Sequence, residues 1–181
     1  MIMNGFEIKI LDFIQNNLRT PFFDFFFSCI TKLGDHGIFW IALSIILLIP
    51  KKTRKVGLTM SFSIIIGYLI GNIALKNIVA RTRPYDLNTA IKLIAAKPHD
   101  YSFPSGHTLI SVECAVSIFF YNKKWGTAAI VTAALVGLSR LYLYMHYPTD
   151  VLCGALLGVA TAFIAKAITD KIYKNKSIKE S

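Results

Sequence analysis

The chain has 181 residues, of which 54% are hydrophobic, a mean hydropathy of +0.52 and a formal net charge of +10. Its apolar residues form long runs that a soluble domain of this length rarely carries, which favours one integral membrane domain over residues 1–181. The basic residues cluster in short segments between those runs without any RNA- or DNA-binding motif, so nucleic acid is not expected as a partner.

The N-terminal part of the chain predicts a helix on the membrane rather than a leader. Residues 6–18 carry apolar side chains at helical spacing with polar residues between them, which is typical of an amphipathic interfacial helix. No basic stretch followed by an apolar core is present, so a cleaved signal peptide is not expected. The aromatic-rich segment opened by Pro21 is short for a span, so it either crosses at a tilt or enters the bilayer partly.

The apolar runs predict an all-α, integral membrane six-helix bundle. The expected spans are, in chain order, residues 20–33, 36–50, 56–80, 105–121, 126–144 and 149–169. Residues 34–37 are expected to form a turn and residues 81–103 a polar loop. Pro148 is expected to begin the last helix, because proline is favoured at the first helical position.

The distribution of lysine predicts the orientation in the membrane. The loop at Lys51, the turn at Lys123 and the tail from Lys171 fall on one side if each span crosses once, and such basic loops are typically cytoplasmic. Both termini are then cytoplasmic in a multi-pass cell-membrane protein. The loop at 81–103 and the turn at His146 share the extracytoplasmic side.

Three polar clusters lie on that side. In residues 76–84, Lys76 and Arg83 are seven residues apart and can share one helix face, although for this cluster taken alone a basic fringe at a helix end is the favoured explanation. In residues 104–107, a proline, Ser105 and Gly106 open a helix whose free N–H groups suit an anion, and His107 lies beside them.

The third cluster, residues 139–150, joins two apolar runs and supplies Arg140, His146 and Asp150. Together the clusters offer three cations, two histidines, a carboxylate and a helix N-terminus. This set is suited to splitting a phosphate ester, with cations on the phosphoryl oxygens, one histidine attacking and the other protonating the leaving oxygen. A metal site would need more carboxylates than the few nearby, so neither a metal nor another cofactor is expected.

The clusters resemble the three signature motifs of the type-2 phosphatidic acid phosphatase (lipid phosphate phosphatase) superfamily. The first is lysine, six residues, Arg-Pro; the second is Pro-Ser-Gly-His; the third is Ser-Arg, five residues, His, three residues, Asp. They occur in order over residues 76–150 without departure from the pattern. The resemblance implies the six-helix membrane bundle of that superfamily, in a short bacterial form similar to undecaprenyl-pyrophosphate phosphatases.

The resemblance also implies a role for each matching residue. His146 would form a phosphohistidine, Asp150 would orient it, and His107 would be the general acid. The phosphoryl oxygens would be held by Lys76, Arg83, Ser105, Gly106 and Arg140.

A metal-independent lipid phosphatase is therefore expected, with undecaprenyl pyrophosphate as the first choice of substrate. Phosphatidylglycerol phosphate or phosphatidic acid is the alternative. More remote alternatives are a binding or transport protein for a lipid phosphate or anion, a metal-dependent phosphatase, and a relative of the soluble vanadium haloperoxidases. The expected partners are the lipid substrate and the bilayer.

Other residues receive weaker predictions. Glu113, inside an apolar run, is expected to pair with a cation, to line the cavity, or to make a polar contact between helices. Arg81 is a second-rank phosphate ligand. The residues expected to have no catalytic role are His36 and His99 as solvated side chains, Cys29, Cys114 and Cys153 as small hydrophobes, and Tyr142, Tyr144 and Tyr147 as an interfacial aromatic belt.

Overall fold

The structure is a computed structural model that describes the backbone of residues 2–179 and the side chains of residues 5–175. Within that range every regular element is helical and no strand occurs, in agreement with the all-α prediction. The elements are α1 (Ile2–Asn17), α2 (Pro21–Thr31), the 3₁₀ segment η1 (Lys32–Gly37), α3 (Ile38–Leu48), α4 (Arg54–Gly67), the π-helical segment η2 (Tyr68–Leu75), α5 (Lys76–Val79), α6 (Pro84–Leu87), α7 (Gly106–Tyr121), α8 (Lys123–Tyr142) and α9 (Pro148–Lys179).

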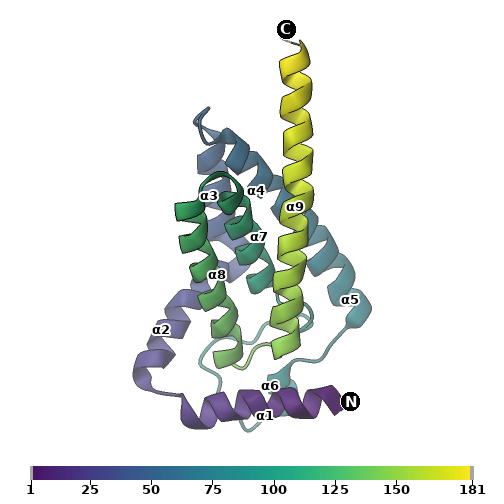
Figure 1. Cartoon of the computed structure of the whole chain (residues 1–181). Coiled ribbons are helices and arrows are strands. Elements are labelled where there is room, and N and C mark those ends of the chain that lie inside the picture. The colour runs from purple at the N-terminus through teal and green to yellow at the C-terminus, as the bar shows by residue number, and fades with distance from the viewer. Residues whose placement is uncertain (1, 180–181) are drawn as a thin grey trace.

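Helix α7 lies at the centre of the bundle, where it packs against α4, α8 and α9 (Figure 1). Helix α1 lies across one end of the bundle, near α6 and the lower ends of α8 and α9. The loop between α6 and α7 and the turn between α8 and α9 are at that same end. We call it the loop end. The end of α9 is at the opposite end, so the two termini are separated by the length of the bundle.

Two predicted spans, 20–33 and 36–50, are joined in the structure into one helical run. Segment η1 connects α2 to α3, with positive φ at His36 (50°) and Gly37 (68°). Residues in this left-handed conformation break the helix and bend it. The chain nevertheless continues in one direction from the loop end to the opposite end (Figure 1).

The arrangement of the helical runs differs from the prediction of six separate spans. In the described part of the chain, four helical runs are long and apolar enough to cross a membrane, and α7 is a fifth, shorter apolar helix; the four are Pro21–Leu48, Arg54–Leu87, Lys123–Tyr142 and Pro148–Asn175. Because α2 and α3 form one continuous run, α1 and the end of α9 lie at opposite ends of the bundle.

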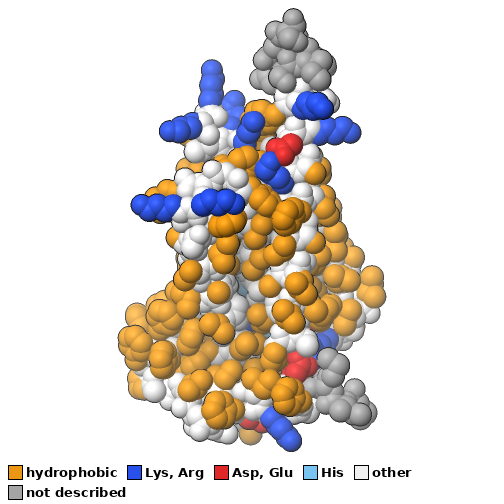
Figure 2. All heavy atoms as spheres, viewed as in Figure 1, with side chains coloured by type: hydrophobic (Ala, Val, Ile, Leu, Met, Phe, Trp, Pro, Cys, Tyr) orange, Lys and Arg blue, Asp and Glu red, His pale blue; other side chains and the backbone are white. Residues whose placement is uncertain are grey.

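The outer surface of the bundle is apolar along its middle and basic at the end remote from the loops (Figure 2). Large hydrophobic side chains such as Ile45, Ile65, Leu156 and Phe163 are more than half exposed. Lysine and arginine side chains gather around the short turns that follow α3 and α7 and along the last turns of α9; they are Lys51, Lys52, Arg54, Lys55, Lys123, Lys124, Lys171 and Lys174. The surface therefore has the pattern of a protein embedded in a bilayer.

The three tyrosines predicted to form an interfacial belt are instead part of a buried cluster at the loop end. Tyr142, Tyr144 and Tyr147 are at most 3% exposed and surround Leu11 of α1. The hydroxyl of Tyr142 donates to Asp24 Oδ1 at 2.6 Å, and that of Tyr144 donates to Asp12 Oδ1 at 2.7 Å. Tyrosine is tolerated in a core when its hydroxyl has a partner, and α2 and α1 supply the partners of Tyr142 and Tyr144. The buried Tyr147 hydroxyl has no hydrogen-bond partner among the described residues.

The α7–α8 hairpin is held together by a very close backbone approach. Asn122 caps α8 by accepting from the backbone N–H of Trp125 at 3.1 Å, which turns the chain sharply. A Cβ added to Gly126 would lie 2.2 Å from Phe119 Cα. Any side chain at position 126 must therefore push the two helices apart.

We expect Gly126→Ala to lower the stability of the folded protein by about 1–3 kcal/mol, the usual cost of overpacking a well-packed contact. The midpoint of thermal unfolding in detergent measures this. Gly5→Ala is the matched control, because a Cβ on Gly5 meets no atom within 4 Å. Equal unfolding midpoints for the two variants would show that the helices can separate at no cost.

Candidate active site

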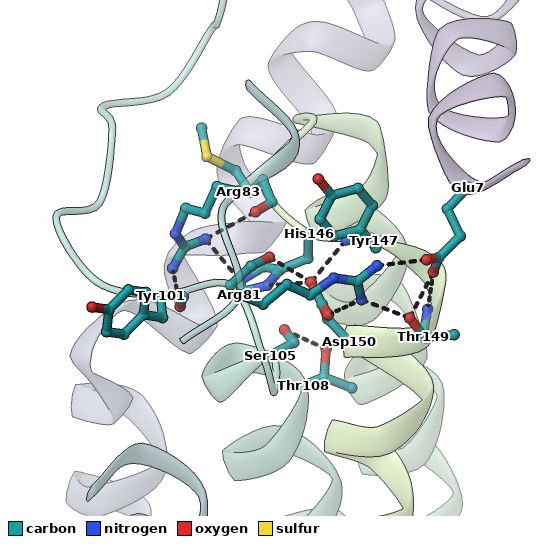
Figure 3. A network of polar contacts seen from close by, with 12 residues as sticks. Glu7, Arg81, Arg83, Tyr101, Ser105, Thr108, His146, Tyr147, Thr149 and Asp150 are labelled. Atoms are coloured by element: carbon teal, nitrogen blue, oxygen red, sulfur yellow. Dashed lines mark hydrogen bonds and ion pairs between the residues drawn. The ribbon is translucent and has the colours of Figure 1, made fainter. Parts of the chain in front are cut away.

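The three polar clusters predicted from the sequence meet at the loop end (Figure 3). Arg83 precedes α6, and Lys76 lies at the start of α5. Arg140 is in the last turn of α8, and His146 is in the turn that follows. All four side chains are at most 9% exposed. Charged groups this deeply buried need partners, so the contacts of each decide what the site can do.

His146 is held between a carboxylate and a guanidinium. Its Nδ1 lies 3.6 Å from Asp150 Oδ2, and its Nε2 lies 3.2 Å from Nη1 of Arg83. The Asp150 carboxylate also accepts from Arg81 Nη1 at 2.6 Å, from the backbone N–H of Tyr147 at 3.0 Å and from the Ser102 hydroxyl. Since Nε2 can only accept from an arginine, this geometry assigns the proton of a neutral ring to Nδ1, facing Asp150.

Arg83 and Lys76 share one carboxylate that the sequence reasoning did not select. Asp100 forms ion pairs with Lys76 Nζ through Oδ2 and with Arg83 Nη2 through Oδ1, the latter at 2.6 Å. The backbone carbonyls of Met145 and Asp100 accept further hydrogen bonds from Arg83 at 2.9 and 2.8 Å. Burial acts to raise the pKa of Asp100, but the hydrogen bond and charge of Lys76 and the charge of Arg83 lower it to about 2.

His107 also has a carboxylate partner that sequence reasoning missed. Its Nε2 lies 2.8 Å from Oδ1 of Asp35, a residue of η1 that was expected to lie in an ordinary turn. Gly34 makes this approach possible, because a Cβ there would lie 2.6 Å from the His107 ring. The only sequence signal for Asp35 was its place in a Gly-Asp-His-Gly turn, which is more often solvated.

Arg140, Ser105 and Gly106 complete the predicted set. Arg140 Nη1 donates to Thr31 Oγ1 at 2.6 Å, while its buried Nε has no hydrogen-bond partner among the described residues. The Ser105 side chain does not cap α7; it accepts from the Thr108 hydroxyl at 3.0 Å. Helix α7 begins at Gly106, and the first N–H groups of any helix lack intrahelical acceptors.

A cavity of about 1270 Å³ connects these groups to an apolar region between the helices. Its polar wall includes Lys76, Arg83, His107, Arg140 and His146, and its apolar wall includes Ile41, Ile64, Ile65, Leu69 and Ile110. A molecule with an anionic head and an apolar tail could therefore contact both walls at once.

Glu113 lines the deep part of this cavity. Its Oε2 accepts from Thr161 Oγ1 of α9 at 2.9 Å, and a Cβ on Gly67 would lie 2.0 Å from the same oxygen. Two of the three expected alternatives are observed: Glu113 lines the cavity and makes a polar contact with another helix. Among the described side chains, residues 5–175, it forms no ion pair.

Burial keeps the His146 ring neutral. It lowers the pKa of His146 to about 3, with Arg83 and Arg140 acting in the same direction and Asp150 opposing them. A neutral imidazole with a proton on Nδ1 keeps the lone pair of Nε2, which accepts from Arg83 in this structure and can attack an electrophile once Arg83 turns away from it. Among the described residues, no group of three or more His, Cys, Asp or Glu side chains could hold a metal ion.

Comparison with known proteins places these features in one family. The model of the PAP2 superfamily matches residues 56–174, which include all three motifs. The chain is 34% identical over 165 residues to an undecaprenyl-diphosphatase of Sulfolobus acidocaldarius, covering 91% of this chain and 79% of that protein. It is 31% identical over 122 residues to the undecaprenyl-diphosphatase BcrC of Bacillus subtilis, covering 66% of this chain and 59% of BcrC.

A solved structure has the same arrangement of helices. The crystal structure of a transmembrane PAP2 type phosphatidylglycerolphosphate phosphatase from Bacillus subtilis superposes with a TM-score of 0.76, covering 94% of this chain and 88% of that one at 26% identity. The likeness extends beyond residues 56–174 to almost the whole chain, so the N-terminal helices are part of the shared fold.

The pKa of His146 predicts how stability depends on pH. Because the folded pKa of about 3 lies below the ordinary value of 6.5, the unfolded chain binds a proton between these pH values that the folded chain does not. Stability therefore falls as the pH falls through this window, by up to about 1.4 kcal/mol for each pH unit. We expect His146→Gln to flatten the decline of the unfolding midpoint between pH 6.5 and 4.5.

The matched control is His99→Gln, which removes an exposed histidine from the loop end. Asp100 does not obscure the comparison, because its pKa of about 2 lies below the chosen window. If the His146→Gln protein loses stability with falling pH as steeply as the wild type, His146 is not held neutral by the fold.

Proposed function

The chain belongs to the PAP2 superfamily, and on that premise we propose that it is a metal-independent lipid phosphatase with His146 as its nucleophile. The observation that carries the proposal is the environment of His146. His146 and Arg83 both line the cavity, where Nε2 of His146 lies 3.2 Å from Arg83 Nη1, while Nδ1 lies 3.6 Å from Oδ2 of Asp150. Binding a phosphate would need only the cations; a neutral, oriented imidazole among them is suited to attack.

The reaction proceeds in two steps. Nε2 of His146 attacks the terminal phosphorus, the bond from phosphorus to the leaving oxygen breaks, and His107 gives a proton to that oxygen. Water then attacks the phosphohistidine, His107 takes a proton from it, and inorganic phosphate and neutral His146 are released. Asp150 stabilises the positive charge that develops on the ring.

Three cations stabilise the negative charge of the phosphoryl group. Lys76, Arg83 and Arg140 hold the equatorial oxygens, as a metal ion does in other phosphatases. Asp100 must release Lys76 and Arg83 when the substrate phosphate arrives. That exchange is feasible because the Asp100 side chain is 48% exposed and can turn toward water. The N–H groups at the start of α7, from Gly106, and the Ser105 hydroxyl complete the oxyanion pocket.

Undecaprenyl pyrophosphate is the proposed substrate. Two relatives are undecaprenyl-diphosphatases by name, and the apolar wall of the cavity, with Ile64, Ile65 and Leu69, suits an isoprenoid tail. The alternative is phosphatidylglycerol phosphate, which is supported by the name of the similar solved structure. Both substrates present a terminal phosphate on a lipid, so the same groups would act on either.

The proposed membrane topology has five crossings, with the active site on the extracytoplasmic side. The basic turns after α3 and α7 and the basic last turns of α9 lie at the end remote from the site, as expected for cytoplasmic segments. Helix α1 then lies in the outer interface, with Phe6 69% and Phe13 59% exposed toward lipid and Leu11 buried against the bundle. The C-terminal part of α9 is cytoplasmic, and α1 is not.

We expect the purified protein to release phosphate from undecaprenyl pyrophosphate in detergent, faster than from phosphatidylglycerol phosphate or phosphatidic acid, and with EDTA present. His146→Ala should lower kcat by at least about a thousandfold, because it removes the nucleophile. His107→Asn should lower it by about 10²–10⁴-fold, because it removes the general acid. Phosphate release for each substrate, with a radiolabelled terminal phosphate, is the measurement.

The same assay distinguishes the alternatives. Labelled protein with the acid-labile, alkali-stable bond of a phosphohistidine is expected in the wild type and not in His146→Ala. Faster hydrolysis of phosphatidylglycerol phosphate would change the proposed substrate but leave the proposed mechanism unchanged. Substrate binding without phosphate release would make the chain a binding protein, and loss of activity in EDTA would make it metal-dependent.

The topology predicts which positions an impermeant thiol reagent can reach in intact cells. In a variant lacking the native cysteines, Lys97→Cys in the α6–α7 loop should be labelled from outside. Lys124→Cys, in the first turn of α8, should be labelled only after the membrane is permeabilised. Both side chains are exposed on the protein, so accessibility depends on the membrane side. The reversed pattern would place the site in the cytoplasm.

A further inference from the structure

A carboxylate of the N-terminal helix reaches the polar groups at the loop end of the bundle (Figure 3). Glu7 of α1 is only 4% exposed although its helix neighbour Phe6 is 69% exposed. Its Oε1 accepts from the backbone N–H of Thr149 at 2.9 Å and from the Thr149 hydroxyl at 2.6 Å. Thr149 is in the first turn of α9, so Glu7 caps the helix that carries Asp150.

Arg81 connects Glu7 to the nucleophile's own carboxylate. One guanidinium nitrogen, Nη2, donates to Glu7 Oε2 at 2.6 Å, and the other, Nη1, donates to Asp150 Oδ1 at 2.6 Å. Nη1 also donates to Thr149 Oγ1 at 2.7 Å. The guanidinium lies over the Tyr147 ring, 3.8 Å from its centroid, which fixes its plane. The Arg81 guanidinium is therefore held by Glu7, by Asp150 and Thr149, and by the Tyr147 ring.

The two carboxylate oxygens of Asp150 therefore have different partners. Oδ1 is taken by Arg81, whereas Oδ2 accepts from Ser102 and the Tyr147 N–H and faces His146 Nδ1 at 3.6 Å. Rotation of the carboxylate would break the bond from Arg81. The orientation of Asp150 toward His146 therefore depends on where Arg81 is held.

The charges of the cluster also depend on Glu7. One guanidinium faces two buried carboxylates, Glu7 and Asp150, so neither is fully neutralised by it. If Glu7 were neutral, the Arg81 charge would act on Asp150 alone and weaken its attraction for the proton and positive charge of the His146 ring. Sharing the arginine keeps negative charge on Asp150.

We propose that Glu7 is a positioning residue for the nucleophile: through Arg81 and the first turn of α9 it orients Asp150 and maintains its charge toward His146. The arrangement of His146 and Asp150 thereby depends on the packing of α1 against the bundle. The inference rests on the proposed phosphatase activity. Arg81, a second-rank candidate for phosphate contact by sequence, donates hydrogen bonds to Glu7, Thr149 and Asp150.

The test is Glu7→Gln, which keeps the size of the side chain and an acceptor for Thr149 but removes the charge shared with Arg81. We expect kcat for phosphate release to fall by about 10–100-fold, the usual effect of losing a group that orients a reacting side chain. KM should change by less than about twofold, since Glu7 touches none of the cavity-lining cations. Formation of the labelled phosphoenzyme in a single turnover should slow by the same factor as kcat.

Asp12→Asn is the matched control. Asp12 is a carboxylate on the same helix that also ties α1 to the bundle, but its partners are the Tyr144 hydroxyl at 2.7 Å and the Asn88 amide at 3.3 Å. If Glu7 only helps α1 to dock, both variants should lose activity and unfolding temperature in parallel. If Glu7 acts through Asp150, only Glu7→Gln loses kcat beyond what its unfolding midpoint explains.

Arg81→Lys provides an independent measurement, because lysine keeps the positive charge but cannot bridge two carboxylates with a planar fork. Arg81→Lys should lower kcat and leave KM unchanged. Adding Glu7→Gln to it should cause little further loss of kcat, because both substitutions disrupt the same contacts from Glu7 through Arg81 to Asp150. Arg81→Lys by itself also tests the inference if Glu7→Gln cannot be isolated as a folded protein.

The outcomes separate the inference from the function on which it rests. A wild-type protein that releases no phosphate from any lipid overturns the proposed function. An active wild type whose kcat is unchanged by Glu7→Gln, or falls no more than in Asp12→Asn, overturns the positioning role alone. Full additivity of Glu7→Gln with Arg81→Lys does so as well.

Discussion

The buried carboxylate of Asp150 is the point on which the arrangement of the site depends. It accepts hydrogen bonds from Arg81, which precedes α6, from Ser102 in the following loop and from the N–H of Tyr147 in its own turn. Its backbone carbonyl accepts from the N–H of Ser105, which directly precedes α7. A fully buried carboxylate is stable only with such partners. The need to satisfy one anion therefore fixes the relative positions of three segments that are remote in sequence.

The cations of the site impose the complementary constraint. Lys76, Arg83 and Arg140 are buried close together, and like charges so placed repel one another in a medium of low dielectric. Asp100 offsets two of them, and the Arg140 guanidinium contacts the neutral hydroxyl of Thr31. The resting site is thus an anion-binding pocket whose charge is partly satisfied by a half-exposed loop side chain. A substrate phosphate with more than one negative charge can satisfy it more completely.

The apolar part of the structure determines what can reach this pocket. The helices around the cavity present Ile64, Ile65 and Leu69 toward it, and their outer faces are apolar as well. A lipid can bring its phosphate to the polar wall while its tail stays among hydrocarbon side chains, which avoids the cost of exposing apolar surface to water.

Much of this could be predicted from the sequence, because the determining signals are local. Long apolar runs indicate membrane helices wherever they occur, and Pro148 begins α9 because its fixed φ and missing N–H suit a first helical position. The motif residues, from Lys76 to Asp150, were identifiable because their types and spacings are specific to phosphate chemistry. Their convergence at the loop end agrees with the expectation that the three clusters share one side of the molecule.

Only the tertiary structure revealed the partners of those residues and the path of the chain. Asp35, Asp100 and Glu7 lie 72, 17 and 74 residues from His107, Arg83 and Arg81, with which they form ion pairs, and no local pattern marks a carboxylate for such a partner. The bend at Gly37 likewise depends on a backbone conformation that a turn-like sequence permits but does not require. The sequence by itself determined which segments are helical and which side chains are proposed to carry the chemistry. Packing decided how α2 and α3 join, where α1 lies and which carboxylates pair with the cations of the site, because these depend on contacts between residues far apart in the chain.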